Sequence, residues 1–261
     1  MNGFFRLCSC FRSKSETLTQ LSNCPTGFLV VIFAIFCAYF PGRGQELNSG
    51  DVGRTREIED LSRSSAWNDR YRAAYLIRSN AISDTAWAIE TAINGMRVEL
   101  ASPSSSRMIP GSYATNSQKV LRAYVEALSN LGPSITGSLS AYKDTLSGDL
   151  KNWITISLGF VKDESVHQEL RGIFSTNADL FTRLMSIEAL GTYADTADIP
   201  VFLEAYSDTS RVTMTMDHDV PGGDFKEDIF PLVGAALHAL GKMGYAVEDD
   251  GKNISLKKLE D

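Results

Sequence analysis

The densest group of side chains that could do chemistry is Asp217-His218-Asp219, with Asp224 a short distance further along. Carboxylate and imidazole groups at this density could bind Ca²⁺, Mn²⁺ or Zn²⁺. The spacing, however, matches neither an EF-hand loop nor an H-E-x-x-H helix. The sequence therefore leaves two interpretations: a solvated acidic loop, which we favour, and the metal site of an exported enzyme.

The remaining reactive residue types form no recognisable catalytic set. His167, His218 and His238 are far apart, and no G-x-S-x-G nucleophile elbow occurs. His238 lies within an apolar run, so we expect a histidine of the core or its boundary. All four cysteines lie in residues 1–37, so the rest of the chain has no disulfide framework, thiolate metal site or cysteine nucleophile. We expect no catalytic residues and no cofactor.

The elements that would position such groups are best seen in Asn177–Asp208, which predicts two short helices packed back to back. Leu180, Leu184 and Leu190 recur at helical spacings, and we expect Gly191 to end the first helix as a left-handed cap. Pro200 then lies in the first turn of the second helix. A unit this small cannot bury its apolar face alone and needs similar units beside it.

A repeated motif supplies such neighbours. Lys151-x-x-Ile154-x-x-Ser157-Leu158-Gly159 matches Arg183-x-x-Ser186-x-x-Ala189-Leu190-Gly191, while Arg70-x-x-Ala73 fits the front of the motif and Ala236-x-x-Ala239-Leu240-Gly241 its back. Small side chains let paired helices approach closely. We therefore expect Ala189 at a helix–helix contact and its neighbour Glu188 on the surface.

This motif resembles the HEAT-repeat family, in particular the short bacterial form related to phycobilisome-lyase-type repeats, over residues 67–243. The resemblance implies an all-α, HEAT-like α-solenoid of about four to five helix pairs that binds other proteins. Lyases of this type act in the cytosol, so the leader described below argues against lyase activity. The alternative is a non-repetitive helical bundle with the same small-residue contacts.

Nine segments read as helical, and two breaks interrupt them. The helices are expected at 54–61, 67–79 (with its arginines outward), 84–100, 119–131, 133–146, 149–161, 164–174, within 177–208, and at 229–243. The breaks, 101–118 and 209–227, read as inserted loops, the second beginning with a short strand at 212–216. Residues 245–256 predict a closing β-hairpin around Asp250-Gly251.

The two inserted loops are the predicted partner-binding surface, because solenoids often place contacts in loops between repeats. Their adaptable apolar side chains are Met108, Tyr113, Met214, Met216 and Phe225.

The first residues of the chain predict a targeting signal and not a folded domain. Phe28–Phe40 is an uncharged apolar run after a net positive segment, the pattern of a signal peptide. It is short for a spanning helix, which needs roughly 20 residues. An uncleaved signal anchor, with the body outside, is the alternative. Cys8-Ser9-Cys10 could be acylated or bind a metal, but we interpret these residues as incidental parts of the leader.

The predicted division is a leader at 1–44, a linker and capping helix at 45–66, repeats at 67–243 and a hairpin or tail at 244–261. Residues 1–44 hold four basic side chains and one acidic, against 25 and 32 in the whole chain, so the rest has an acidic excess of about ten. Such a body repels phosphate backbones, and we expect no nucleic-acid partner. The sequence predicts an exported, non-catalytic scaffold in the periplasm or outside the cell, which binds another protein and touches the membrane only through an uncleaved leader.

Overall fold

The computed structural model describes residues 52–79, 84–103, 114–216, 225–251 and 253–259, all within one compact unit of residues 49–261. The predicted leader, including Phe28–Phe40 and the cysteines, lies outside the described residues. So do Met108 and Tyr113 of the first inserted loop and the candidate metal ligands Asp217, His218, Asp219 and Asp224.

The described chain is mostly helical, as predicted. Its ten α-helices are α2 (Val52–Ser62), α3 (Trp67–Ser79), α4 (Thr85–Ala101), α5 (Asn116–Asn130), α6 (Thr136–Asp144), α7 (Gly148–Phe160), α8 (His167–Thr176), α9 (Leu180–Tyr193), α10 (Ile199–Ser207) and α11 (Pro231–Lys242). Short 3₁₀ turns at Pro133–Ile135, Glu164–Val166 and Thr196–Asp198 lead into α6, α8 and α10. No helix in these ranges combines the length and the apolar character needed to cross a membrane.

Two antiparallel hairpins accompany the helices, one predicted and one not. Strands β3 (Tyr245–Asp249) and β4 (Ile254–Lys258) form the predicted C-terminal hairpin. Strand β1 (Val212–Met216) is also confirmed, but it pairs with a second strand, β2 (Phe225–Ile229), where we expected an irregular loop. The Gly222-Gly223 pair before β2 is a turn signal for this hairpin, whereas β2 itself, Phe-Lys-Glu-Asp-Ile, has no alternation of apolar and polar residues that would predict a strand.

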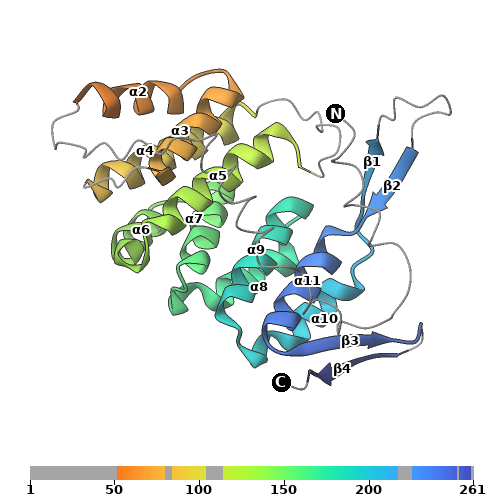
Figure 1. Cartoon of the computed structure of the whole chain (residues 1–261). Coiled ribbons are helices and arrows are strands. Elements are labelled where there is room, and N and C mark those ends of the chain that lie inside the picture. Colours follow the sequence, from red (N-terminus) through yellow and green to blue (C-terminus); the bar gives the residue numbers. More distant parts are fainter. Residues whose placement is uncertain (1–51, 80–83, 104–113, 217–224, 252, 260–261) are drawn as a thin grey trace, which may run out of the picture. The chain divides into compact units, whose positions relative to one another are not determined.

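The odd-numbered helices form a continuous series. Helix α3 packs on α5, α5 on α7, α7 on α9, and α9 on α11 (Figure 1). The even-numbered helices flank this series: α4 packs on α5, α6 on α7, α8 on α9, and α10 on α11. Each odd-numbered helix in the middle therefore contacts both the previous and the next one, and the series presents a face of its own.

The Ala-Leu-Gly motif lies at the contacts within this series. Ala189 is fully buried, and a Cβ placed on Gly159 of α7 would lie 3.0 Å from the Cβ of Ala189 on α9. One helix later, a Cβ on Gly191 would lie 3.0 Å from the Cβ of Ala239 on α11. The glycine of one motif thus faces the alanine of the Ala-Leu-Gly step in the next, and the predicted contact position of Ala189 is confirmed.

The same glycines are not helix caps, which corrects the prediction for Gly191. Helix α9 continues to Tyr193, and the left-handed residue is Ala194, with φ 54°. In α7 the left-handed residue is Lys162, with φ 60°, and its amide donates to the carbonyl of Gly159 while the amide of Asp163 donates to Leu158. This is a Schellman ending. The glycine is required by the close approach of the next helix, not by the turn.

The expectation that the arginines of α3 point outward is confirmed for Arg72 and Arg78, which are exposed, but is wrong for Arg70, the basic residue that opens the motif. Arg70 is 1% exposed and pairs with the fully buried Glu99 of α4, its Nε and Nη2 lying 2.7 and 2.6 Å from Glu99 Oε2. In α9, Arg183 bonds the carbonyl of Phe174 at 3.0 Å and pairs with Asp208 after α10. Both arginines tie their helix to a neighbouring one.

Candidate functional site

The series of odd-numbered helices carries a hollow of about 430 Å³, which we call the first hollow. Its apolar part consists of Phe160, Leu184, Ile229, Phe230 and Pro231, together with Gly234 and Ala235. Its polar part consists of Arg122, Glu188, Thr192, His238 and Lys242. These residues come from α5, α7, α9 and α11, with Ile229 at the end of β2 and Phe230 between β2 and α11. The hollow is therefore built by consecutive helices of one face.

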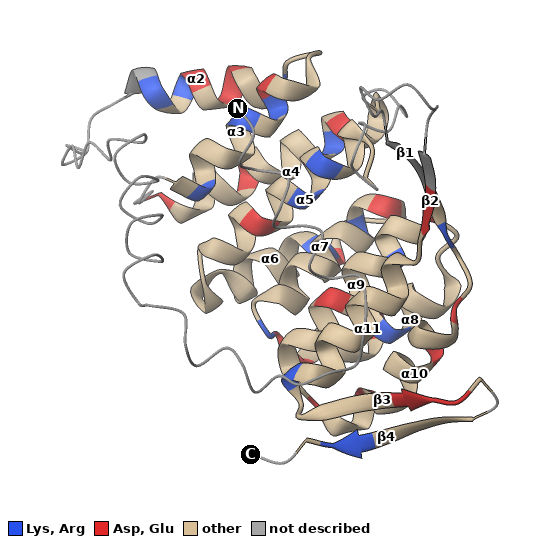
Figure 2. Ribbon diagram, turned by 45° about the vertical axis from the view of Figure 1, so that its right-hand side comes forward, with Lys and Arg blue, Asp and Glu red and all other residues tan. Residues whose placement is uncertain are grey.

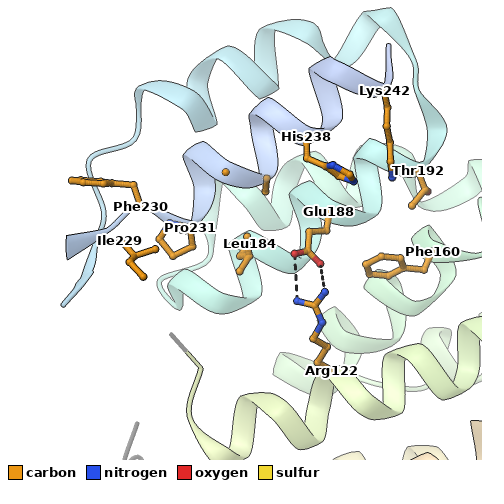
Figure 3. Close-up of a pocket in the computed structure, with 12 residues that line it drawn as sticks. Arg122, Phe160, Leu184, Glu188, Thr192, Ile229, Phe230, Pro231, His238 and Lys242 are labelled. Carbon is orange, nitrogen blue, oxygen red and sulfur yellow. Dashed lines mark hydrogen bonds and ion pairs between the residues drawn. The ribbon is translucent and has the colours of Figure 1, made fainter. Parts of the chain in front are cut away.

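An ion pair lies across the middle of the first hollow (Figure 3). Arg122 of α5 faces Glu188 of α9, with Nη2 3.1 Å from Oε2 and Nη1 3.4 Å from Oε1. Arg122 also pairs with Glu126 at 3.2 Å, and Glu126 pairs with Arg78 of α3 at 2.6 Å. Glu188 is half-buried, so the prediction of a plain surface position for it is wrong.

Helix α11 contributes two further polar groups, His238 and Lys242, which are one turn apart. Figure 3 shows both side chains on the same side of the hollow, with Glu188 and Thr192 beside them. His238 is exposed, so the expectation of a core or boundary histidine is wrong. Helix α11 is buried through Leu232, Ala236, Ala239 and Leu240 only, and a histidine at position 238 falls on the opposite face.

A second hollow, also of about 430 Å³, adjoins the first. It is lined by Trp67, Asn68, Tyr71, Lys119, Arg122, Ala123 and Glu126, so the two hollows share Arg122. Trp67 and Tyr71 meet edge to face with ring centroids 6.5 Å apart, and Tyr71 is 43% exposed. The two hollows together form what we call the odd-helix face: an aromatic surface with a guanidinium at its centre.

A buried carboxylate lies elsewhere, between α8 and α10. Asp198 is fully buried, and its oxygens lie 2.7 Å from His167 Nε2 and 2.6 Å from Arg171 Nη2. His167 stacks on Tyr193, whose hydroxyl donates to the carbonyl of Asp163 at 2.7 Å. Burial, and then the nearby carboxylates, raise the pKa of Tyr193 above its ordinary value.

The same cluster includes a geometric candidate for a metal site. The ligand atoms of His167, Asp195 and Asp198 lie within 4.8 Å of one another. Arg171, however, already neutralises Asp198 through two hydrogen bonds, and Asp195 accepts the amide of Ala197 at 2.9 Å. A cation here would have to displace the guanidinium of Arg171. We therefore interpret the cluster as a buried ion-pair network that holds α8 against the turn before α10.

The predicted binding residues are only partly located. Met214, Met216 and Phe225 lie on β1 and β2, with Met216 paired opposite Phe225. Strand β2 ends at Ile229, which lines the first hollow, so this hairpin is adjacent to the odd-helix face.

Sequence reasoning missed the residues of the hollows themselves, because they come from helices far apart in the chain and no local motif joins them. The exposed positions of consecutive motif helices, compared with one another, are the sequence signal that could have indicated these residues.

Comparison of the chain with protein-family models, with curated proteins and with solved structures finds no match.

Proposed function

We propose that this chain is an exported, HEAT-like repeat protein that acts as a non-catalytic scaffold and binds another protein through the odd-helix face. The repeat interpretation is supported by equivalent contacts at equivalent motif positions, Gly159 with Ala189 and Gly191 with Ala239. Stacked units of this kind present extended surfaces that bind partners. Export rests on the leader pattern at Phe28–Phe40, and mass spectrometry of the protein's N-terminus would test its cleavage.

The observation that carries the binding proposal is the pair of adjoining hollows that share Arg122. Hollows of about 300–1,000 Å³ lined mainly by apolar and aromatic groups, with a few placed polar groups, are the usual shape of small-molecule sites. At protein interfaces, anchoring side chains of one partner fill pockets of the other. Aromatic residues and arginine are also enriched where proteins meet. The exposed aromatic side chains of this face, Tyr71 and Phe230, are 43% and 41% exposed.

The hairpin of the second inserted loop supports the same surface. Because β2 runs directly into Ile229 and Phe230, a partner seated in the first hollow would lie beside the strands that carry Met214, Met216 and Phe225. We therefore extend the proposed surface from the loops alone to the loops together with the helical face that they adjoin.

Site-specific photo-crosslinking tests this proposal. A photoreactive phenylalanine analogue is placed at Tyr71 or Phe230 of the full chain, and at Tyr142 on α6 as a control of similar exposure, 37%. We expect one protein adduct shared by the first two positions and missing at Tyr142. Equal labelling at all three positions, or none at Tyr71 and Phe230, would refute the odd-helix face as a binding surface.

Metal analysis of the same preparation separates this function from the alternative, an exported metal-dependent enzyme that uses Asp217, His218, Asp219 and Asp224. That alternative predicts bound metal and a lower melting temperature in chelator. The scaffold proposal predicts neither.

A further inference from the structure

The geometry points to the chemistry of the partner: we propose that the odd-helix face binds an extended acidic segment that presents one aromatic side chain to the first hollow. This inference rests on the proposed scaffold function and adds the kind of segment bound. The ligand is an acidic peptide of a partner protein, because the face has a net positive charge whereas the body as a whole is acidic. The charged residues that line the two hollows are Lys119, Arg122 and Lys242 against Glu126 and Glu188.

The charge argument concerns the lysines of the two hollows. Lys119 lies in the second hollow and Lys242 in the first, and neither ammonium group has an ion-pair or hydrogen-bond partner among the described residues. Several other basic side chains of the described body are engaged, as in Arg70 with Glu99 and Lys143 with Glu169 at 2.6 Å, whereas Lys119 and Lys242 lie unpaired within the hollows themselves. The body carries an acidic excess of about ten, and Figure 2 shows acidic residues on many of its elements. Two lysines without partners at one face are therefore the groups available to a carboxylate.

The middle of the face is already neutral, which determines where the acidic groups must lie. Arg122 is shared between Glu188 and Glu126, and Glu126 also pairs with Arg78, so two guanidinium groups balance two carboxylates. Unmatched positive charge is left at Lys119 in one hollow and at Lys242 in the other. A ligand that uses both lysines must cross Arg122, and this requires an extended segment with carboxylates on both sides of its centre.

The apolar lining of the first hollow indicates which side chain the middle of the acidic segment should carry. Leu184 is buried beneath the first hollow, and Phe160, Phe230 and Pro231 stand around it (Figure 3). Aromatic pairs at an edge-to-face or offset distance add to the burial of apolar area. A phenylalanine or tyrosine flanked by glutamate or aspartate is therefore the segment that the face matches best.

Fluorescence anisotropy with three labelled peptides tests this. The probe peptide has one phenylalanine flanked by glutamates; one comparison peptide replaces the glutamates by glutamine, and the other replaces the phenylalanine by alanine. We expect the full chain to bind the probe more tightly than either comparison peptide. Lys242→Glu should weaken binding by roughly tenfold, because one attraction is replaced by a repulsion. Lys258→Glu, the same charge change on exposed β4, should leave it within about twofold.

Each outcome of these binding measurements supports or overturns the acidic-segment proposal. Binding of the glutamine peptide as tightly as the probe, or equal weakening by Lys242→Glu and Lys258→Glu, would overturn the acidic segment. Absence of any binding to the probe would overturn it as well. If the crosslinks at Tyr71 and Phe230 still form in that case, the scaffold function survives with a partner of different chemistry, so the two failures are distinguishable.

Discussion

Substitution of the glycine in the repeated motif tests how closely successive odd-numbered helices pack, because the added methyl group must fit between them. Gly159 and Gly241 occupy the same motif position in α7 and α11, and both lie near a helix end. A Cβ on Gly159 would lie 2.7 Å from Leu170 Cδ1 and 3.0 Å from the Cβ of Ala189. Leu170 is fully buried, so its methyl group has no open space to move into. Around Gly241 nothing lies within 4 Å of the same point.

Replacing each glycine by alanine therefore separates the backbone effect from the packing effect. Removing a helical glycine stabilises by about 0.5–1 kcal/mol, and this gain is common to both variants. Forcing a methyl group into a closed contact costs about 1–3 kcal/mol. We expect Gly241→Ala to be as stable as the natural chain or more stable, and Gly159→Ala to be less stable than Gly241→Ala by about 1–3 kcal/mol.

Urea denaturation followed by circular dichroism gives the free energy of unfolding of both variants. Gly191→Ala serves as an intermediate case, because its nearest contact is a single Cβ at 3.0 Å. Equal stability of Gly159→Ala and Gly241→Ala would mean that the motif glycine is not a packing residue, and the repeat register would lose its physical basis.

Three further changes test other contacts. Ala189→Leu should lower the free energy of unfolding by about 1–3 kcal/mol in urea melts, because the side chain is fully buried against α7; no loss would refute that contact. Tyr124→Phe should raise the melting temperature, since the buried Tyr124 hydroxyl has no hydrogen-bond partner among the described residues and removing such a group relieves about 1–3 kcal/mol of desolvation; a lower melting temperature would reveal a partner for it. Asp208→Asn should destabilise at neutral pH: burial opposes ionisation of Asp208, but hydrogen bonds from Ser210 and Arg183 outweigh it and hold the pKa below the ordinary value of 3.8. A lowered folded-state pKa contributes stability above the ordinary value and loses it on acidification, so thermal melts against pH should show the deficit of Asp208→Asn shrinking below about pH 4; a constant deficit would refute this.

The order of the helices could be predicted from the sequence because each copy of the motif places small residues at the same kind of helix–helix contact. Small residues at Ser157, Ala189 and Ala239 are the direct signature of close helix contacts, and all are buried. The predicted start of α5, at Lys119, is too late, because Thr115 and Gln118 form a capping box and the helix begins at Asn116. That signal is local and readable.

Other features could not be read from local patterns. Arg70 looks like a surface arginine until Glu99, which is on the next helix, is placed beside it. The odd-helix face likewise depends on which exposed side chains of different helices meet, as Arg122 meets Glu188. Periodicity predicts which face of a helix is buried, whereas the neighbour across a gap is decided by the tertiary arrangement.

The C-terminal hairpin has a consequence for self-association. Helix α11 is the last of the series, and β3 packs on it, with Tyr245, Val247 and Leu256 partly buried against the core. A stack of similar helices with an open end can accept the first helices of another molecule, and head-to-tail contacts of this kind do not close but grow into filaments. Two short strands occupy that end and carry the exposed charged residues Glu248, Lys257 and Lys258. They would block such a head-to-tail contact and leave the proposed binding face to a partner of another kind.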